Sequence, residues 1–201
     1  MAKLFKDRIL REKLENYEIP DLEKKIAVIK GWYDASENGS LQQKTETQCE
    51  QAFNQDFFVE VLGYTPFPNE TYTIDPKART ESGGQKPDAI LGYFGPDAKR
   101  TIAVVEIKDA NTALDKPQRR EGNMSPIQQA FKYKPQYKEC DFAIATNFVE
   151  IRVFKDNQLD YEKFTLGELV DPKDDYFAFK KFYKTPTGKR KLLSKMKCRI
   201  V

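Results

Sequence analysis

The chain has 201 residues, 39% hydrophobic and 32% charged, a balance typical of a folded globular domain rather than a disordered one. It contains no histidine, which excludes histidine-dependent triads and the common zinc sites and leaves catalysis to carboxylates, lysine, tyrosine or an oxygen-bound cation. Three cysteines without metal-ligand spacing, no signal peptide and no apolar stretch of membrane length predict a cytoplasmic protein without membrane contact.

Two helices are predicted before residue 45. Apolar residues return at helical spacing between Leu4 and Leu14, and again between Leu22 and Trp32. Asp21 is suited to cap the second helix, and the polar stretch 34–40 is suited to end it. We expect residues 1–44 to form an N-terminal helical extension that acts as a lid or a brace and carries no chemistry.

A third helix is predicted over 45–62, with a capping box at its start and Gly63 as its stop. Its buried stripe consists of Phe53, Phe57 and Val61. Glu50 falls on this stripe, and two interpretations stay open. It is either a carboxylate at the edge of the stripe that reaches water or a basic partner, or one presented to a site beneath the helix.

Strands are predicted next, and the most apolar of them ends in charged residues. The earlier segments are a weak strand at 71–74, a flexible loop at 79–85 and a strand at 88–94. The stretch 101–109 is continuous and β-branched, as expected of a strand buried on both faces. Glu106 and Lys108 close it, and they share a face because side chains alternate along a strand.

Ionised groups at the end of a buried strand are expected to be paired or to bind an ion. Asp88 opens the preceding strand, with 17 residues between it and Glu106. If the two strands form a hairpin, both carboxylates meet at one end of the sheet. Asp88, Glu106 and the carbonyl of Ile107 are then expected to hold a hard cation, while a structural salt-bridge cluster remains the alternative.

The rest of the chain predicts an α/β fold. A polar segment at 109–125 precedes a helix that begins at Pro126 and is stopped by Pro135. Strands at 141–146 and 150–154 suit a hairpin, and a helical turn follows at 165–170. The order of helix, three strands, helix and two strands predicts a mixed sheet flanked by helices.

The carboxyl end is predicted to be a basic tail over 176–201. From 180 to 201 there are nine basic residues and no acidic one, which leaves 25 basic and 31 acidic residues in the remainder. Such a tail is expected to contact a polyanion or an acidic partner, or else to stay solvated.

Three short motifs follow one another along the chain: Pro87-Asp88, then Glu106-Ile107-Lys108, then Gln129-Ala-Phe-Lys-Tyr133. Together they resemble the PD-(D/E)XK nuclease superfamily. The surrounding motifs look like the N-terminal nuclease region of fused, type IIG-like restriction–modification enzymes: Lys86-Pro-Asp-Ala89, Leu114-Asp115 with Gln118, Ser125-Pro126, Thr146-Asn147 and Glu150-Ile-Arg152. The resemblance covers about residues 45–154.

This resemblance implies a restriction-endonuclease-like sheet, with the nuclease core at 45–175 and the basic tail as a link to a missing methyltransferase or specificity domain. The chain has no Asn-Pro-Pro-Tyr motif and no glycine-rich cofactor loop. It therefore corresponds either to an excised nuclease domain or to a stand-alone relative.

The implied activity is hydrolysis of DNA by an endonuclease that uses Mg²⁺, with Mn²⁺ as an alternative. In such a reaction Lys108 of this chain would orient or deprotonate the attacking water, and the pKa of Lys108 would be lowered beside the metal. The remaining roles go to Asp88, Glu106 and Ile107 as metal ligands, Glu50 as an assisting acid, and Gln129 with Tyr133 as residues that position the phosphate or the Lys108 region. The alternative is a nuclease-like module that binds DNA or protein without catalysis, and no residue separates DNA from RNA as the substrate.

Overall fold

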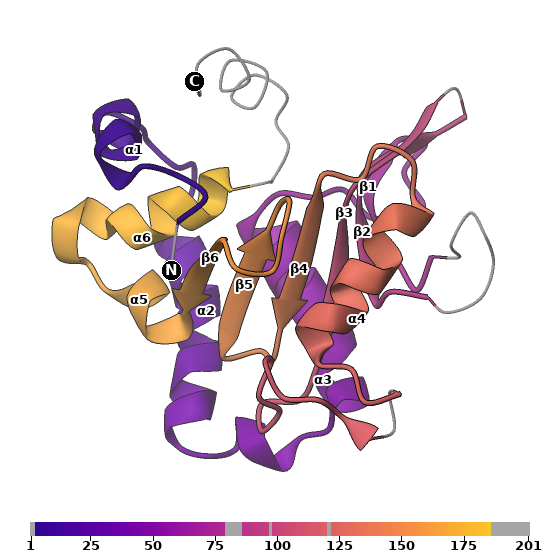
Figure 1. Ribbon diagram of the computed structural model, residues 1–201. Coiled ribbons are helices and arrows are strands. Elements are labelled where there is room, and N and C mark those ends of the chain that lie inside the picture. The colour runs from indigo at the N-terminus through magenta and orange to yellow at the C-terminus, as the bar shows by residue number, and fades with distance from the viewer. Residues whose placement is uncertain (1–2, 79–85, 97, 120–121, 186–201) are drawn as a thin grey trace.

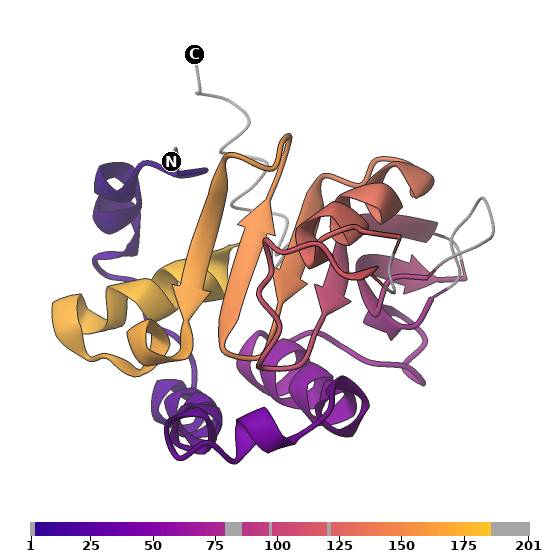
Figure 2. The same cartoon turned by 60° about the horizontal axis from the view of Figure 1, so that its bottom comes forward.

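The computed structural model describes residues 3–78, 86–96, 98–119 and 122–185. A six-stranded mixed sheet with its strands in chain order lies at the centre, and helices cover both of its faces (Figures 1 and 2). This confirms the predicted α/β class with its helical N-terminal segment. Within the described ranges, no helix is both long enough and apolar enough to cross a membrane. The predicted loop at 79–85 and the last sixteen residues of the basic tail, 186–201, lie outside the described residues.

The strands are β1 (Tyr72–Pro76), β2 (Ala89–Gly95), β3 (Ala98–Ile107), β4 (Phe142–Thr146), β5 (Glu150–Phe154) and β6 (Tyr161–Thr165). Among the six described strands, β3 and β4 are the one pair that runs in parallel, and the long crossover between them contains α4 (Pro126–Tyr133), as a parallel connection requires. Strand β6 was not predicted. The side chains of Glu162 and Phe164 are the buried ones of this strand. Because one of them is an acid, the sequence does not show the alternation of apolar residues by which a strand is predicted.

The other helical segments are α1 (Asp7–Leu14), α2 (Leu22–Glu37), η1 (Leu41–Gln43), α3 (Glu46–Phe53), η2 (Asn54–Val61), η4 (Lys134–Gln136), α5 (Leu166–Val170) and α6 (Lys173–Lys184). Two expectations were wrong. Asp21 precedes α2 in a left-handed conformation (φ 54°) and makes no side-chain cap, and α2 continues into the stretch expected as a loop. The wider π-helical turn η2 prolongs α3, so that the pair covers the span predicted as one helix.

Strand β3 is buried on both faces, as its composition predicts. Ala103, Val105 and Ile107 pack in the core beneath α3 and η2, together with Phe53 and Phe57. Val104 belongs to the second core, beneath α4. Figure 1 shows α4 in front of the sheet and α3 behind it. The sheet is therefore the middle of three layers, and the ends of its strands lie between two helices.

Helix α3 begins at a capping box, as predicted. Thr45 Oγ1 accepts a hydrogen bond from the backbone N–H of Gln48 at 3.4 Å, and the Gln48 side chain accepts one from the Thr45 N–H at 3.0 Å. Both residues are exposed, so the cap contributes through these hydrogen bonds rather than through packing.

Replacing Thr45 by alanine is expected to lower the free energy of unfolding by about 1 kcal/mol, because the first turn of α3 loses its acceptor. Urea denaturation measures this change, and Thr45→Ser, which keeps the hydroxyl, is expected to match the original chain. Equal stability of Thr45→Ala and Thr45→Ser would contradict the prediction.

The first residues of the chain are fastened to α6 through a buried ion-pair group. Glu162 is 2% exposed, accepts a hydrogen bond from the Phe5 N–H at 2.9 Å and pairs with Lys181 at 2.5 Å. Lys181 also pairs with Asp7 at 2.8 Å. Lys181 and its neighbour Lys180 were predicted to lie in the basic tail, but both are buried in α6. Their charge is neutralised within the fold, and Figures 1 and 2 show α1 beside α6.

Candidate metal centre

The β2–β3 hairpin brings Asp88 and Glu106 to the same end of the sheet. Ala89 pairs with Val105 in this antiparallel register, so the residue before β2 lies beside the end of β3. The Asp88 N–H donates to the Val105 carbonyl at 3.0 Å. The Ile107 N–H donates to Asp88 Oδ2 at 2.6 Å, which orients the carboxylate. The expected meeting of the two strand ends is therefore present.

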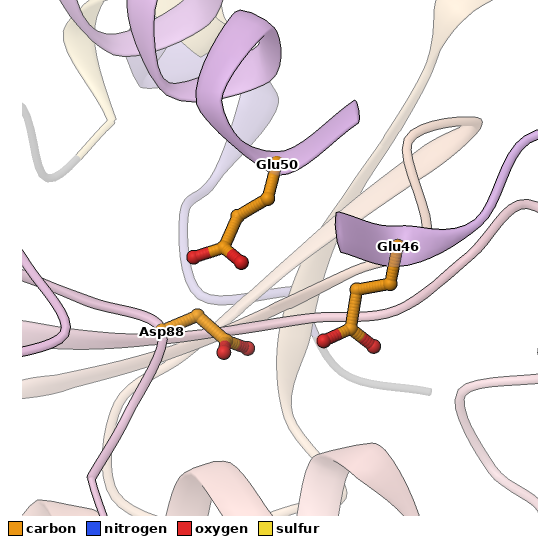
Figure 3. A group of neighbouring side chains, drawn as sticks. All are labelled: Glu46, Glu50 and Asp88. Atoms are coloured by element: carbon orange, nitrogen blue, oxygen red, sulfur yellow. The ribbon is translucent and has the colours of Figure 1, made fainter. Parts of the chain in front are cut away.

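Helix α3 adds two more carboxylates from the other layer. Glu46 and Glu50 are four residues apart, so they lie on one face of the helix. Oxygens of Glu46, Glu50 and Asp88 all lie within 4.8 Å of one another. Figure 3 shows the two glutamates descending from the helix toward Asp88. We refer to Glu46, Glu50, Asp88 and Glu106 as the acid cluster.

Two lysines enter the acid cluster from different sides. Lys77, just after β1, bonds Asp88 Oδ1 through its ammonium and lies 3.1 Å from Glu50 Oε1. Lys108 lies 2.6 Å from Glu106 Oε1 and 3.7 Å from Glu46 Oε2. The two differ in solvent contact, because the Lys77 side chain is 51% exposed and the Lys108 side chain only 11%.

The acid cluster carries more negative than positive charge. With all groups ionised, its four carboxylates and two ammonium groups leave a net charge of −2. Burial raises the pKa of Glu106, and repulsion from Asp88 raises it further, against the opposing effect of Lys108. Burial likewise raises the pKa of Glu46, although Lys108 opposes this. This excess of carboxylates over ammonium groups favours an added cation.

Lys108 is held in its ammonium form. Burial by itself would lower the pKa of Lys108, but Glu106 and the other carboxylates raise it above its ordinary value. The lowered pKa expected from the sequence depends on a bound metal and stays a prediction, and the carboxylates alone act in the opposite direction. The physical reason is that more than one carboxylate faces this ammonium group.

The remaining predicted residues take other positions. Ile107 is fully buried, and the contact that it makes with the acid cluster is through its N–H. Gln129 is buried on α4, and its amide donates to Gln118 Oε1 at 3.2 Å. Tyr133 packs in the core between α4 and the sheet. The predicted roles of Gln129 and Tyr133 at a phosphate thus rest on the resemblance alone.

Polar residues hold the segment before α4 against the end of the sheet at which Asp88 and Glu106 lie. The Arg152 guanidinium donates to Asp115 at 2.8 Å and to Glu150 at 2.7 Å. The Asn147 amide donates to the Thr112 carbonyl at 2.9 Å. Asp115, Asn147, Glu150 and Arg152 belong to the motifs that carry the resemblance in the sequence, and here they hold the crossover segment in place.

Glu46 and Lys77 were missed by sequence reasoning. Glu46 could have been found, since an acid four residues before Glu50 shares its helix face. Lys77 carried no usable signal, because the Asp75-x-Lys77 pattern resembles several solvated acid-x-lysine pairs in the chain. Its place in the acid cluster depends on the path of the backbone after β1.

The donors of the acid cluster suit a hard divalent cation. Magnesium and manganese prefer carboxylate oxygens, and three such oxygens already converge. The Lys77 ammonium between Asp88 and Glu50 shows that these oxygens accept a cation between them. The residues therefore fit the metal that the resemblance implies.

Comparison with models of known families, with curated proteins and with solved structures gives no match. The function is therefore argued from the residues and the geometry of the chain itself.

Proposed function

We propose that the protein is a Mg²⁺-dependent DNA endonuclease, the cleavage domain of a restriction–modification type of enzyme. The observation that carries the proposal is the convergence of the acid cluster and Lys108 at the end of the β2–β3 hairpin. A buried lysine beside several carboxylates at the ends of the strands is an arrangement suited to phosphodiester hydrolysis. The ordered motifs noted in the sequence support the same reaction class.

Asp88, Glu50 and Glu46 are the residues that would hold the metal, because their oxygens lie nearest to one another. Glu106 was expected as a direct ligand, and it pairs instead with Lys108 in this arrangement. It would thus contribute by positioning Lys108 and by adding negative charge beside the ion. A bound Mg²⁺ supplies polarisation of the phosphate and a lowered pKa for a water ligand.

Lys108 would act as a charged hydrogen-bond donor. Its ammonium form is favoured by the surrounding carboxylates, so it is suited to orient the attacking water and to offset negative charge that develops on the phosphate. Its small exposure keeps it in place before the substrate arrives. The role of a general base, one of the two considered from the sequence, is less well supported.

The protein is expected to nick supercoiled plasmid DNA when Mg²⁺ or Mn²⁺ is added and to leave it intact in EDTA. Gel electrophoresis of the plasmid measures this, with an RNA of similar length tested in parallel. Glu50→Gln is expected to slow the cleavage, and Glu60→Gln, a change of the same kind on η2, is the matched control.

Salt-sensitive binding of DNA without cleavage under either metal would contradict the proposal and support the non-catalytic binding module. Cleavage of RNA alone would change the substrate while leaving the metal centre in place.

A further inference from the structure

Lys77 contacts Asp88 through both its backbone and its side chain. The Lys77 N–H donates to the Asp88 carbonyl at 2.8 Å, and its backbone adopts a left-handed conformation (φ 53°). Its ammonium then bonds Asp88 Oδ1 and reaches Glu50 Oε1 at 3.1 Å. A cation that belongs to the chain itself thus lies between two residues of the proposed metal centre.

Lys77 bonds an Asp88 oxygen that a metal at this centre would use. Asp88 Oδ2 accepts the hydrogen bond from the Ile107 N–H at 2.6 Å. Oδ1 is the oxygen that this backbone hydrogen bond does not use, and it bonds the Lys77 ammonium. A divalent ion and an ammonium group repel each other at such short range, so both cannot share the same pair of carboxylates.

Lys77 can leave this position more easily than Lys108 can. Its side chain is about half exposed, and a lysine ammonium on a flexible stem is readily hydrated. The side chains that it bonds are only 13% and 9% exposed, so Glu50 and Asp88 stay where they are. The lysine is the mobile partner in a fixed acidic site.

We infer that Lys77 is a resident competitor for the metal: it keeps Glu50 and Asp88 together when no metal is bound, and a divalent ion must displace it. The inference rests on the proposed metal centre. It implies that the protein binds metal more weakly than its carboxylates alone would allow, so that loading requires a higher concentration of free divalent ion.

The test is a calorimetric titration of the full chain with Mn²⁺ in the absence of nucleic acid. Lys77→Met is expected to bind Mn²⁺ roughly fivefold more tightly, since the ion no longer has to break a partly exposed ion pair of about 1 kcal/mol. Methionine is unbranched like lysine, so it tolerates the left-handed backbone about equally well.

Lys163→Met is the matched control, because Lys163 also pairs with a glutamate, Glu150, at 3.0 Å and is 43% exposed. Its Mn²⁺ affinity is expected to equal that of the original chain. Lys77→Gln, which loses the charge but keeps a hydrogen-bond donor, covers the case in which Lys77→Met does not fold, as judged by thermal unfolding.

Unchanged or weaker Mn²⁺ binding by the folded Lys77 variants would overturn the inference, because a residue that only supports the fold cannot raise affinity when it is removed. An absence of Mn²⁺ binding in the original chain and in both variants would overturn it as well. If the Lys77 variants bind Mn²⁺ more tightly but the original chain does not cut DNA, the inference is upheld and the nuclease proposal is rejected. Cleavage by the original chain without tighter binding by the variants would reject the inference alone.

Discussion

Asp88→Asn is expected to weaken Mn²⁺ binding by roughly 100-fold and to remove metal-dependent cleavage. The asparagine oxygen can keep the hydrogen bond from the Ile107 N–H, which now holds Asp88 Oδ2. The amide nitrogen then replaces Oδ1, the oxygen that faces Glu50 and Lys77. A coordinating anion becomes a hydrogen-bond donor while the shape of the side chain is preserved.

Calorimetry measures the affinity, and plasmid nicking measures the cleavage. Asp75→Asn is the matched control, because Asp75 lies on the neighbouring strand, with Ile90 of β2 as its register partner. It is expected to bind Mn²⁺ as the original chain does. Retention of full affinity by Asp88→Asn would remove Asp88 from the metal centre.

Lys108→Met is expected to reduce the rate of cleavage by about 10²- to 10⁴-fold while Mn²⁺ binding persists. The substitution removes the ammonium that lies 2.6 Å from Glu106 and keeps an unbranched side chain in its buried place. The protonated form of Glu106 becomes more favourable without Lys108, because burial and Asp88 already raise its pKa. The fold is therefore expected to tolerate the loss of this ion pair.

Single-turnover cleavage and Mn²⁺ calorimetry on the same preparation separate the two effects. Lys163→Met again serves as the control for removal of an ammonium paired with a glutamate. Cleavage at the original rate would exclude Lys108 from the reaction. Loss of Mn²⁺ binding together with cleavage would reassign Lys108 to the assembly of the acid cluster.

The centre of the fold and three of the four acids of the acid cluster could be predicted because they depend on local rules. The alternation of side chains along 101–107 and the antiparallel return of β2 require Asp88 and Glu106 to approach each other. The capping box at Thr45 sets the start of α3 and hence the face on which Glu50 lies. These steps need only the spacing of neighbouring residues.

Other parts could not be predicted because they depend on partners distant in the chain. Glu162 can point from β6 into the interior of the protein because Lys181, nineteen residues later, neutralises its charge. In the sequence alone, Lys180 and Lys181 resemble the start of a solvated tail. The fold shows their partners, which are Asp175 for Lys180 and Asp7 with Glu162 for Lys181. Lys77 likewise enters the acid cluster through the path of the chain after β1.

The ion-pair group formed by Glu162, Lys181, Asp7 and the Phe5 N–H joins the two ends of the described chain. Proteolytic trimming of the first seven residues would strip Lys181 of one counter-ion and Glu162 of a donor within a nearly water-free space. Loosening at the amino end would thereby reach α6.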